Sequence, residues 1–266
     1  LKVELAIINN FIDIIEIKGE IADKINLNLN GDNVPLDLFK STNIVKSDLD
    51  YEGDLNFQGT IKGKREDFVV DLSTNLTDLQ VLGITLNDIN GNLNYNSNGR
   101  LTFKQVLNQT KNQNIIAEGN LRTKERFIPE IEIKVNNYKL NQIANIDGNI
   151  GSLNGNINGN ITLRGEMQNP QLSGELDLVL SKLSIEGIAN INNVNGILSF
   201  DERQITLNDI KGRFGGGSFT LTGKVNYLNQ ENFWEVRLQG ENFKFNRGSY
   251  NGYYNPDIRV LNEFRN

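Results

Sequence analysis

Apolar residues recur at every second position along most of this chain, with polar residues between them. A period of two is that of a β-strand with one buried face, whereas an amphipathic helix repeats about every 3.6 residues. The helical period is hard to find in this sequence. We therefore predict an all-β fold, over half strand and with almost no helix. The clearest runs are Ile25, Leu27, Leu29; Leu55, Phe57; Ile131, Ile133, Val135; and Leu172, Leu176, Leu178, Leu180.

Short clusters of Asn and Gly interrupt the apolar runs. Asn-Gly dipeptides tolerate positive φ and are favoured in tight hairpin turns. We therefore predict an antiparallel meander with turns at Asn90-Gly91, Asn154-Gly155, Asn158-Gly159 and Asn195-Gly196. We attribute the general abundance of Asn to genome composition.

The chain also repeats itself at a spacing of about 104 residues. LQVLGI at 79–84 matches LSIEGI at 183–188, INGNLNY at 89–95 matches VNGILSF at 194–200, and GDLNFQG at 53–59 matches GNITLRG at 159–165. Repeats that cannot bury an apolar face alone usually stack on their neighbours into an elongated body. We predict the end of one repeat at 1–24, full β-repeat units at 25–130 and 131–236, and the start of a further repeat at 237–266.

Composition restricts the chemistry that this fold can carry. The 266 residues, 38% of them hydrophobic, are enough for a sizeable core. A net charge of −6 and a pI near 4.9 leave little cationic surface for nucleic acid or for anionic lipid headgroups. Cys and His are absent, which removes disulfides, thiolate nucleophiles, imidazole acid–base catalysis and nearly all zinc or iron sites. We predict a protein that is not an enzyme and that has no cofactor and no metal.

A glycine-rich segment, RFGGGSFTLTGKV at 213–225, partly imitates a phosphate-binding loop. The G-x-x-x-x-G-K-[ST] pattern wraps backbone N–H groups around phosphates and directs a hydroxyl to Mg²⁺. One residue too many separates Gly217 from Gly223, and Val225 stands in place of the hydroxyl. Phe219, Leu221 and Val225 instead follow the strand period. We interpret the glycines as a bend between two strands.

Three other clusters have ordinary structural interpretations. The segment 48–53 imitates the start of a calcium loop, but Gly59 occupies the position of the bidentate Glu, so we interpret it as a polar turn. Two carboxylate pairs lack a neighbouring aromatic sugar platform and are interpreted as solvated charges: Asp201 with Glu202, and Glu130 with Glu132. An aromatic cluster is interpreted as the start of a strand pair, whose partner lies outside this sequence, rather than a binding surface: Phe243, Phe245, Tyr250, Tyr253 and Tyr254.

Export and membrane signals are missing from the sequence. It has no run of 18 or more apolar residues, and its beginning lacks the pattern of a signal peptide. We therefore expect a piece of a longer protein whose targeting elements lie elsewhere.

The repeat motifs resemble those of the TamB and AsmA-like envelope proteins of diderm bacteria. The resemblance rests on VNGILSF at Val194 to Phe200 and on ITLNDIKGRFGGGSFTLTGKV at Ile205 to Val225. The segment Trp234 to Val260 is similar to the start of a further unit, and together these patterns extend over most of the chain. The resemblance implies a β-taco, a sheet folded lengthwise around an apolar groove. It also implies a periplasmic protein, anchored in the inner membrane by a segment outside this sequence.

The resemblance implies one of two functions. One is a bridge whose groove conducts phospholipid between the inner and outer membranes, with acyl chains as its partners. The other is a scaffold for the assembly of outer-membrane proteins and autotransporters, together with an outer-membrane protein of the TamA/BamA type. From alternation alone, the same apolar stripes also fit a closed β-solenoid or sandwich, either a structural surface protein or a polysaccharide-active β-helix enzyme.

We take one set of alternating apolar residues as candidates for the groove lining. They are Leu79, Val81, Leu93, Leu101, Phe103, Leu178, Leu180, Leu183, Ile185, Leu198, Ile205, Leu207, Phe219, Leu221 and Val225.

Overall fold

The protein is built almost wholly of antiparallel β-strands, as a computed structural model shows. The model describes residues 2–9, 12–40, 51–81, 84–86, 88–110, 112–122, 128–142, 150–165, 170–185, 190–226, 233–247 and 250–262. Seventeen of the described strands belong to one antiparallel sheet, and the other two form a second. Helical structure in this part of the chain is limited to α1 (Asp37–Lys40) and the 3₁₀ turn η1 (Leu140–Gln142). The predicted all-β fold is confirmed.

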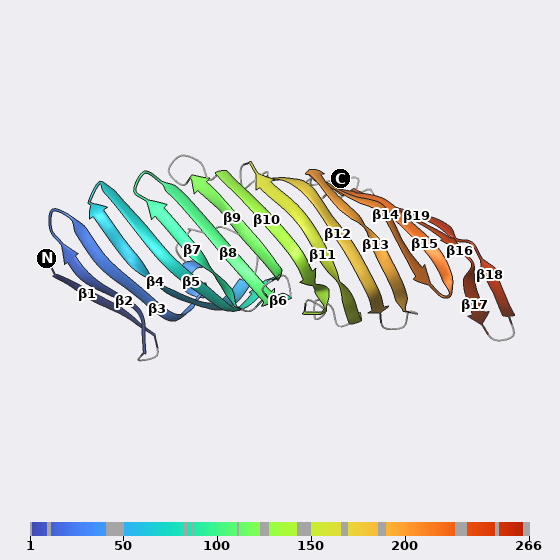
Figure 1. The fold of residues 1–266 in the computed structure, drawn as a ribbon, viewed down its shortest axis with the longest axis horizontal. Helices are drawn as coiled ribbons and strands as arrows, with labels where there is room; N and C mark the ends of the chain where they lie inside the picture. The colour runs from blue at the N-terminus through green and yellow to red at the C-terminus, as the bar shows by residue number, and fades with distance from the viewer. Residues whose placement is uncertain are drawn as a thin grey trace. The chain divides into compact units, whose positions relative to one another are not determined.

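The chain divides into two compact units, Leu1–Asn108 with Ile115–Ile131, and Gln109–Asn114 with Glu132–Asn266. We call them unit 1 and unit 2. In unit 1, each strand pairs with the next from β1 to β5, and β5 then pairs with both β6 and β7 (Figure 1). Its strands are β1 (Lys2–Asn9), β2 (Ile12–Ile21), β3 (Ile25–Pro35), β4 (Tyr51–Lys64), β5 (Asp67–Val81), β6 (Ile84–Leu86), β7 (Ile89–Asn96), β8 (Arg100–Thr110) and β9 (Gln113–Arg122).

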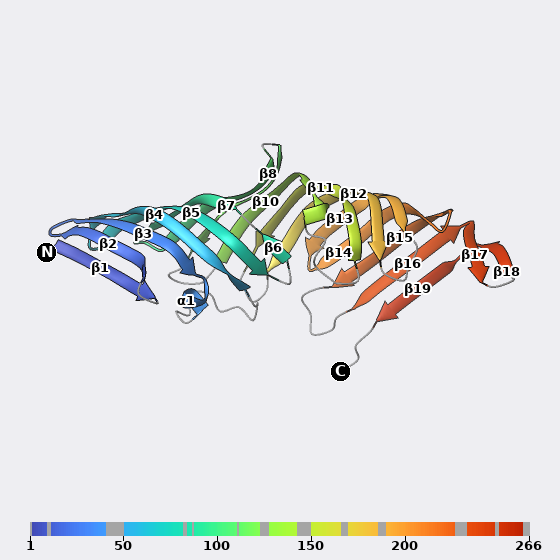
Figure 2. The same ribbon diagram turned by 90° about the horizontal axis from the view of Figure 1, so that it is seen from below.

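In unit 2, β11 to β16 pair in succession, and β19 continues the sheet on β16. The hairpin of β17 and β18 branches off between β16 and β19. Figure 2 shows the sheet of unit 2 curling from β12 round to β19. The strands are β10 (Ile128–Lys139), β11 (Ile150–Arg164), β12 (Gln171–Ile185), β13 (Ile191–Glu202), β14 (Gln204–Phe214), β15 (Gly217–Asn226), β16 (Trp234–Glu241), β17 (Phe243–Arg247), β18 (Tyr250–Tyr254) and β19 (Asp257–Asn262).

The strand registers of the two units can be compared directly. In unit 1, Leu72 lies opposite Leu93, which lies opposite Phe103. The corresponding row in unit 2 runs from Leu176 through Leu198 to Leu207. Leu93 and Leu198 are therefore structural counterparts, as the sequence match between 89–95 and 194–200 predicts.

The strands that precede these rows, β4 in unit 1 and β11 in unit 2, do not follow the sequence match. Gly59 lies opposite Leu72, whereas Gly159 lies opposite Leu176. The structural counterpart of Gly59 is therefore Gly159, and the sequence match to Gly165 was wrong by six residues. β4 ends at Lys64 and β5 begins at Asp67, whereas β11 ends at Arg164 and β12 begins only at Gln171. The longer connection in unit 2 moves β11 along its partner relative to β4. The division into four repeat segments stays a prediction.

The predicted Asn-Gly turns are wrong. Gly91, Gly155, Gly159 and Gly196 all lie inside strands. A Cβ at Gly91 would stand 2.0 Å from the carbonyl oxygen of Lys104, so the missing side chain permits close approach of the neighbouring strand. Tight turns occur instead at 65–66 and at Gly215-Gly216.

β-Bulges shape the sheets of both units. Seven of the eight described non-glycine residues with positive φ are Asn or Asp, the residues that tolerate this conformation best. A bulge inserts one extra residue, bends the strand and turns the next side chain toward the other face. Each of five such residues directly precedes a buried apolar side chain: Asn33 before Val34, Asn137 before Tyr138, Asn193 before Val194, Asp209 before Ile210, and Asn242 before Phe243.

Asn side chains accept hydrogen bonds from the N–H groups of three of these positive-φ residues, two inside strands and one, Asn242, between β16 and β17. A bulged residue leaves the regular ladder, so its N–H group needs another acceptor. The N–H of Asn33 donates to Oδ1 of Asn56 at 2.9 Å, and that of Asn137 donates to Oδ1 of Asn158 at 2.5 Å. In unit 2 the N–H of Asn242 donates to Oδ1 of Asn255 at 2.8 Å. Part of the Asn content therefore has a specific structural role, beyond any bias of genome composition.

Candidate functional site

An apolar hollow of about 490 Å³ lies on one face of the unit 2 sheet. Its volume falls within the range of roughly 300–1,000 Å³ that is usual for small-molecule sites. The lining contains no charged residue, and its members come from strands β12 to β19 across the curl of the sheet. They are Leu178, Leu180, Leu183, Ile191, Val194, Ile210, Phe214, Phe219, Leu221, Leu238, Phe243, Tyr254, Pro256 and Ile258.

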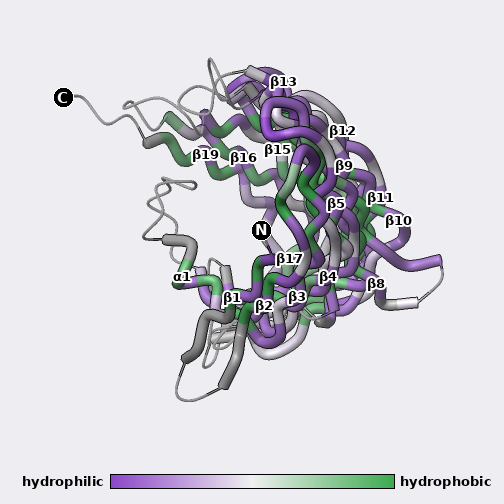
Figure 3. The backbone as a smooth tube through the Cα atoms, turned by 90° about the vertical axis from the view of Figure 1, so that its left-hand side faces the viewer, coloured by the Kyte–Doolittle hydropathy of each residue, from purple (hydrophilic) through white to green (hydrophobic). Residues whose placement is uncertain are grey.

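Exposure within the hollow rises from floor to rim. Leu180, Val194 and Ile210 form a buried cluster at the floor, each no more than 6% exposed. Leu178 and Phe219 pack against this cluster and are half-buried. Ile258 at the margin is exposed. The apolar lining therefore remains accessible from outside, as a ligand site requires. Figure 3 shows that hydrophobic and hydrophilic residues alternate along the strands.

Phe243 closes one side of the hollow. Its ring is only 3% exposed and lies 5.4 Å from the ring of Phe214 and 5.8 Å, edge to face, from that of Tyr254. A Cβ at Gly217 or Gly240 would come within 2.8 Å of this ring. Glycine at both positions therefore makes room for the aromatic side chain.

The triple glycine at 215–217 has the predicted role of a bend between strands. Gly215 and Gly216 have φ values of 58° and 87° and connect β14 to β15. The carbonyl of Gly215 accepts a hydrogen bond from the N–H of Lys244 at 3.1 Å, which ties the turn to the start of β17. Lys224 lies in β15 opposite Thr206 and Glu235, at the other end of the strand from the turn.

The structure brings part of the predicted groove lining together. Five of the candidates line the hollow: Leu178, Leu180, Leu183, Phe219 and Leu221. Leu198 and Leu207 pack against its floor cluster, and Ile205 lies opposite Val225 in the neighbouring strand pair. In unit 1, Leu79, Leu93, Leu101 and Phe103 are half-buried. The side chains of Val81 and Ile185 lie outside the described residues.

Sequence alternation missed Ile210 of the floor because a bulge changes the phase of its strand. Ile205 and Leu207 predict position 209 as the next inward residue. Asp209 has a φ of 43°, and the register shifts between Leu207 and Ile210, so Ile210 faces inward instead. Asn193 changes the phase between Ile191 and Val194, whereas Val194 is in phase with Leu198 and could have been included from alternation. Asn or Asp directly before an out-of-phase apolar residue was the available signal. No pattern in the sequence placed Phe214, Leu238, Pro256 or Ile258 in the lining.

The corresponding row of unit 1 is interrupted by polar groups. We call this row the central row: Phe57, Thr74, Gly91 and Gln105 in unit 1, and Ile157, Leu178, Gly196 and Ile210 in unit 2. Gln105 Nε2 donates a hydrogen bond to Thr74 Oγ1 at 2.9 Å. The side chain of Gln105 crosses over Gly91, where a Cβ would stand 2.5 Å from its Oε1. In unit 2, Ile210 occupies the same place over Gly196, where a Cβ would stand 2.6 Å from its Cγ1.

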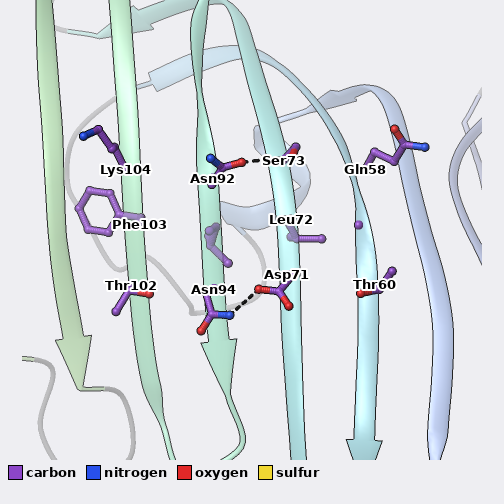
Figure 4. A pocket seen from close by; sticks show the side chains of 12 residues that line it. Gln58, Thr60, Asp71, Leu72, Ser73, Asn92, Asn94, Thr102, Phe103 and Lys104 are labelled. Carbon is purple, nitrogen blue, oxygen red and sulfur yellow. Dashed lines mark hydrogen bonds between the residues drawn. The ribbon is translucent and has the colours of Figure 1, made fainter.

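The opposite face of unit 1 carries a shallow polar trough of about 550 Å³. Two parallel rows of polar side chains border it, with Ser73 and Asn92 in one row and Asp71 and Asn94 in the other (Figure 4). Ser73 Oγ donates to Asn92 Oδ1 at 3.2 Å, and Asn94 donates to Asp71. These polar groups bond to one another across the strands, which is the usual organisation of a solvated sheet face.

Two ion pairs join β16 to β19 on the polar face of unit 2. Arg237 donates through Nε and Nη2 to the carboxylate of Asp257 at 2.8 and 2.6 Å, and Arg259 Nε donates to Glu235 at 2.7 Å. The hydrogen bond from Arg237 lowers the pKa of Asp257, and the one from Arg259 lowers the pKa of Glu235. Both pairs are solvent-exposed, so they stabilise the strand pairing only slightly.

The other sequence motifs lie in strands, turns or surface ion pairs, or outside the described residues. Residues 48–50 lie outside the described residues, and 51–53 begin β4. Glu132 pairs with Lys134 at 3.2 Å, Asn120 donates to Glu130, and Asp201 and Glu202 end β13 at an exposed turn. Phe243 and Tyr254 face each other in the β17–β18 hairpin, so the aromatic cluster does form strands, but the expectation that their partner lies outside this sequence was wrong. Phe243 and Tyr254 also line the hollow, which the interpretation as strand residues alone had not foreseen. The side chains of Phe245 and Tyr250 are not described. In the described ranges, no three acidic side chains are grouped closely enough to hold a metal.

Comparisons with protein families, with curated proteins and with solved structures find no match to this chain. Of the helices in the described part, none has the length and hydrophobicity to span a bilayer.

Proposed function

We propose that the protein binds the acyl chains of phospholipid in the apolar hollow of unit 2. The observation that carries this proposal is the lining itself, which joins side chains from strands β12 to β19 into one accessible surface without a charge. A closed core would bury such side chains fully, but Leu178, Phe219 and Leu221 are half-buried. A hydrocarbon chain placed here would leave water at a gain of about 0.8 kcal/mol per methylene.

The lining also suits movement of a lipid rather than tight capture. Specific orientation in a binding site usually depends on a few well-placed polar groups. The floor cluster of Leu180, Val194 and Ile210 provides only dispersion contacts, which change little as a chain is displaced along them. We propose that the chain is a segment of a periplasmic bridge that conducts phospholipid between the inner and outer membranes. The resemblance of the repeat motifs to those of TamB and AsmA-like proteins supports this location, and a segment outside this sequence would supply the inner-membrane anchor.

A photo-crosslinking pair tests acyl-chain binding. A benzophenone amino acid at 178 would face the hollow, whereas at 179 it would lie on the opposite face, where Val179 is 49% exposed. Both chains are irradiated with phosphatidylethanolamine vesicles, and the adducts are identified by mass spectrometry. We expect lipid adducts at 178 and few at 179. Equal labelling at both positions, or none at 178, would refute the proposal, as would purified chain that carries no phospholipid.

A second candidate function is that of a scaffold for the assembly of outer-membrane proteins. The observation that favours it is the group of exposed apolar residues on β18 and β19, because such patches mark protein interaction sites. They are Tyr253, Tyr254, Ile258, Val260 and Leu261. A crosslinker at 260 in cells would yield adducts with an outer-membrane precursor or a TamA/BamA-type protein under this function, and lipid or no adducts under the first.

A further inference from the structure

The hydrogen-bonded pair of Thr74 and Gln105 interrupts the apolar face of unit 1. Its cross-strand neighbour Phe57 and the adjacent Leu72 and Leu93 are apolar and half-buried. A polar pair in such a row costs stability relative to apolar packing unless it has partners. Unit 2 shows that the same fold accommodates Leu178 and Ile210 in these places. The sheet itself therefore does not require a polar pair at this point.

The pair has unused hydrogen-bonding capacity. A Gln amide has two N–H donors, and one of them is directed to Thr74 Oγ1 at 2.9 Å. The hydroxyl of Thr74 lies 3.2 Å from Oε1 of the same amide, so each side chain holds the other in place. Both side chains are half-buried and remain within reach of a ligand on this face. The second amide N–H is thus a fixed, uncharged donor.

We propose that Thr74 and Gln105 form a site for the ester carbonyl of an acyl lipid, with Gln105 as the donor and Thr74 as the positioning residue. The proposal rests on the proposed function, since it assumes that acyl chains lie along the apolar face. A neutral donor suits a neutral carbonyl oxygen, whereas a phosphate group attracts Arg or Lys. Unit 1 would then hold a lipid at a defined depth, and unit 2, with Leu178 and Ile210, would not.

The experiment compares two lipids at two equivalent positions. Leu93 and Leu198 occupy corresponding places in the rows next to the central row. A benzophenone amino acid is placed at 93 or at 198 of the full chain, which is irradiated with vesicles holding equal amounts of diester and diether phosphatidylethanolamine of the same chain length. The diether lipid lacks the carbonyl oxygens but keeps the headgroup and chains. The ratio of ester to ether adducts is measured by mass spectrometry.

We expect the ester to be preferred about two- to tenfold at 93, the range that one hydrogen bond contributes, and not to be preferred at 198. Thr74→Val with Gln105→Met should abolish the preference at 93, and Thr74→Ser, which keeps the hydroxyl, should retain it. Equal ratios at 93 and 198, or a preference that survives the double substitution, would overturn the inference alone. An absence of adducts at 93 with adducts at 198 would also overturn it. An absence of adducts at both positions would overturn the proposed function as well.

Discussion

The central rows of the two units differ in chemistry although their strands pair in the same way. In unit 1 the row reads Phe57, Thr74, Gly91 and Gln105, and in unit 2 it reads Ile157, Leu178, Gly196 and Ile210. The glycine is common to both, and in each unit a long side chain from the next strand lies over it. The fold therefore fixes where a side chain lies, while the residue at that place decides whether the face is continuous hydrocarbon.

The strand register that places this side chain over the glycine also differs between the units. β7 and β8 keep a regular register at Gln105, whereas the register of β14 shifts at Asp209 before Ile210. Ile210 is 6% exposed, but Gln105 is only half-buried. A bulge thus drives the side chain of unit 2 deeper into its row than that of unit 1. Substitutions at these two positions should have unequal effects.

The largest effect is expected for Ile210→Asp. An unpaired carboxylate among Leu180, Val194 and the rest of the floor should destabilise unit 2 by several kcal/mol. Urea unfolding followed by the fluorescence of Trp234, the single tryptophan, reports on unit 2. Gln105→Glu, followed by circular dichroism, should cost much less because that site is half-buried. Equal losses of stability at 105 and 210 would show that the two positions do not differ in their tolerance of a charge.

The next effect is expected for Phe243→Ala. Removing a ring that is 3% exposed and contacts Phe214 and Tyr254 should cost about 3 kcal/mol, the low end for buried Phe→Ala. Its matched substitution in unit 1 is Phe57→Ala, where the ring lies over Gly31 and is half-buried. We expect a smaller loss there. The same urea titrations measure both, and a cost at 57 equal to that at 243 would show that burial does not separate the two rings.

A smaller effect, equal in the two units, is expected when the Asn side chains that accept the bulge N–H groups are removed. Asn56→Ala and Asn158→Ala each remove the oxygen that accepts a bulge N–H, which should cost about 1 kcal/mol. Asn94→Ala is the control, since Asn94 bonds only across the exposed polar face to Asp71. We expect little change for the control in the thermal unfolding midpoint. If all three substitutions behaved alike, the acceptors would have no special role at the bulges.

The smallest effect concerns the polar face of unit 2. The pKa of Asp257 is lowered in the folded protein by its hydrogen bond from Arg237, so the pair stabilises at pH values above the ordinary carboxyl pKa. That contribution disappears as pH falls through the lowered pKa of Asp257. The difference in urea midpoint between the parent and Asp257→Asn should therefore be small near neutral pH and vanish in acid. It should also shrink at about 1 M salt, where surface pairs are screened. A difference that grew in acid would contradict this assignment.

The alternation of apolar residues was sufficient to predict the strands and five of the fourteen residues that line the hollow, and the glycine run predicted the turn at 215–216. It failed where the chain departs from a period of two, because Asp209 and Asn193 each shift the phase without changing the composition of the strand. Asn-Gly pairs were placed in turns because their preference for positive φ is shared by bulges and turns. The position of Phe243 against Phe214 depends on how β17 leaves β16, which no local pattern encodes.

The bulges described above also have a consequence for how strands find their partners. Strands from similar repeats resemble one another, and a sheet with a period of two can slip by two residues without exposing its apolar side chains. A slipped β3 or β10 would separate the N–H of Asn33 or Asn137 from the Asn oxygen that receives it. The bulged residue would then face its neighbour without an acceptor. Each Asn bulge therefore favours the correct strand register over registers that are shifted by two residues. A chain without these bulges would be prone to misaligned strand pairing and aggregation.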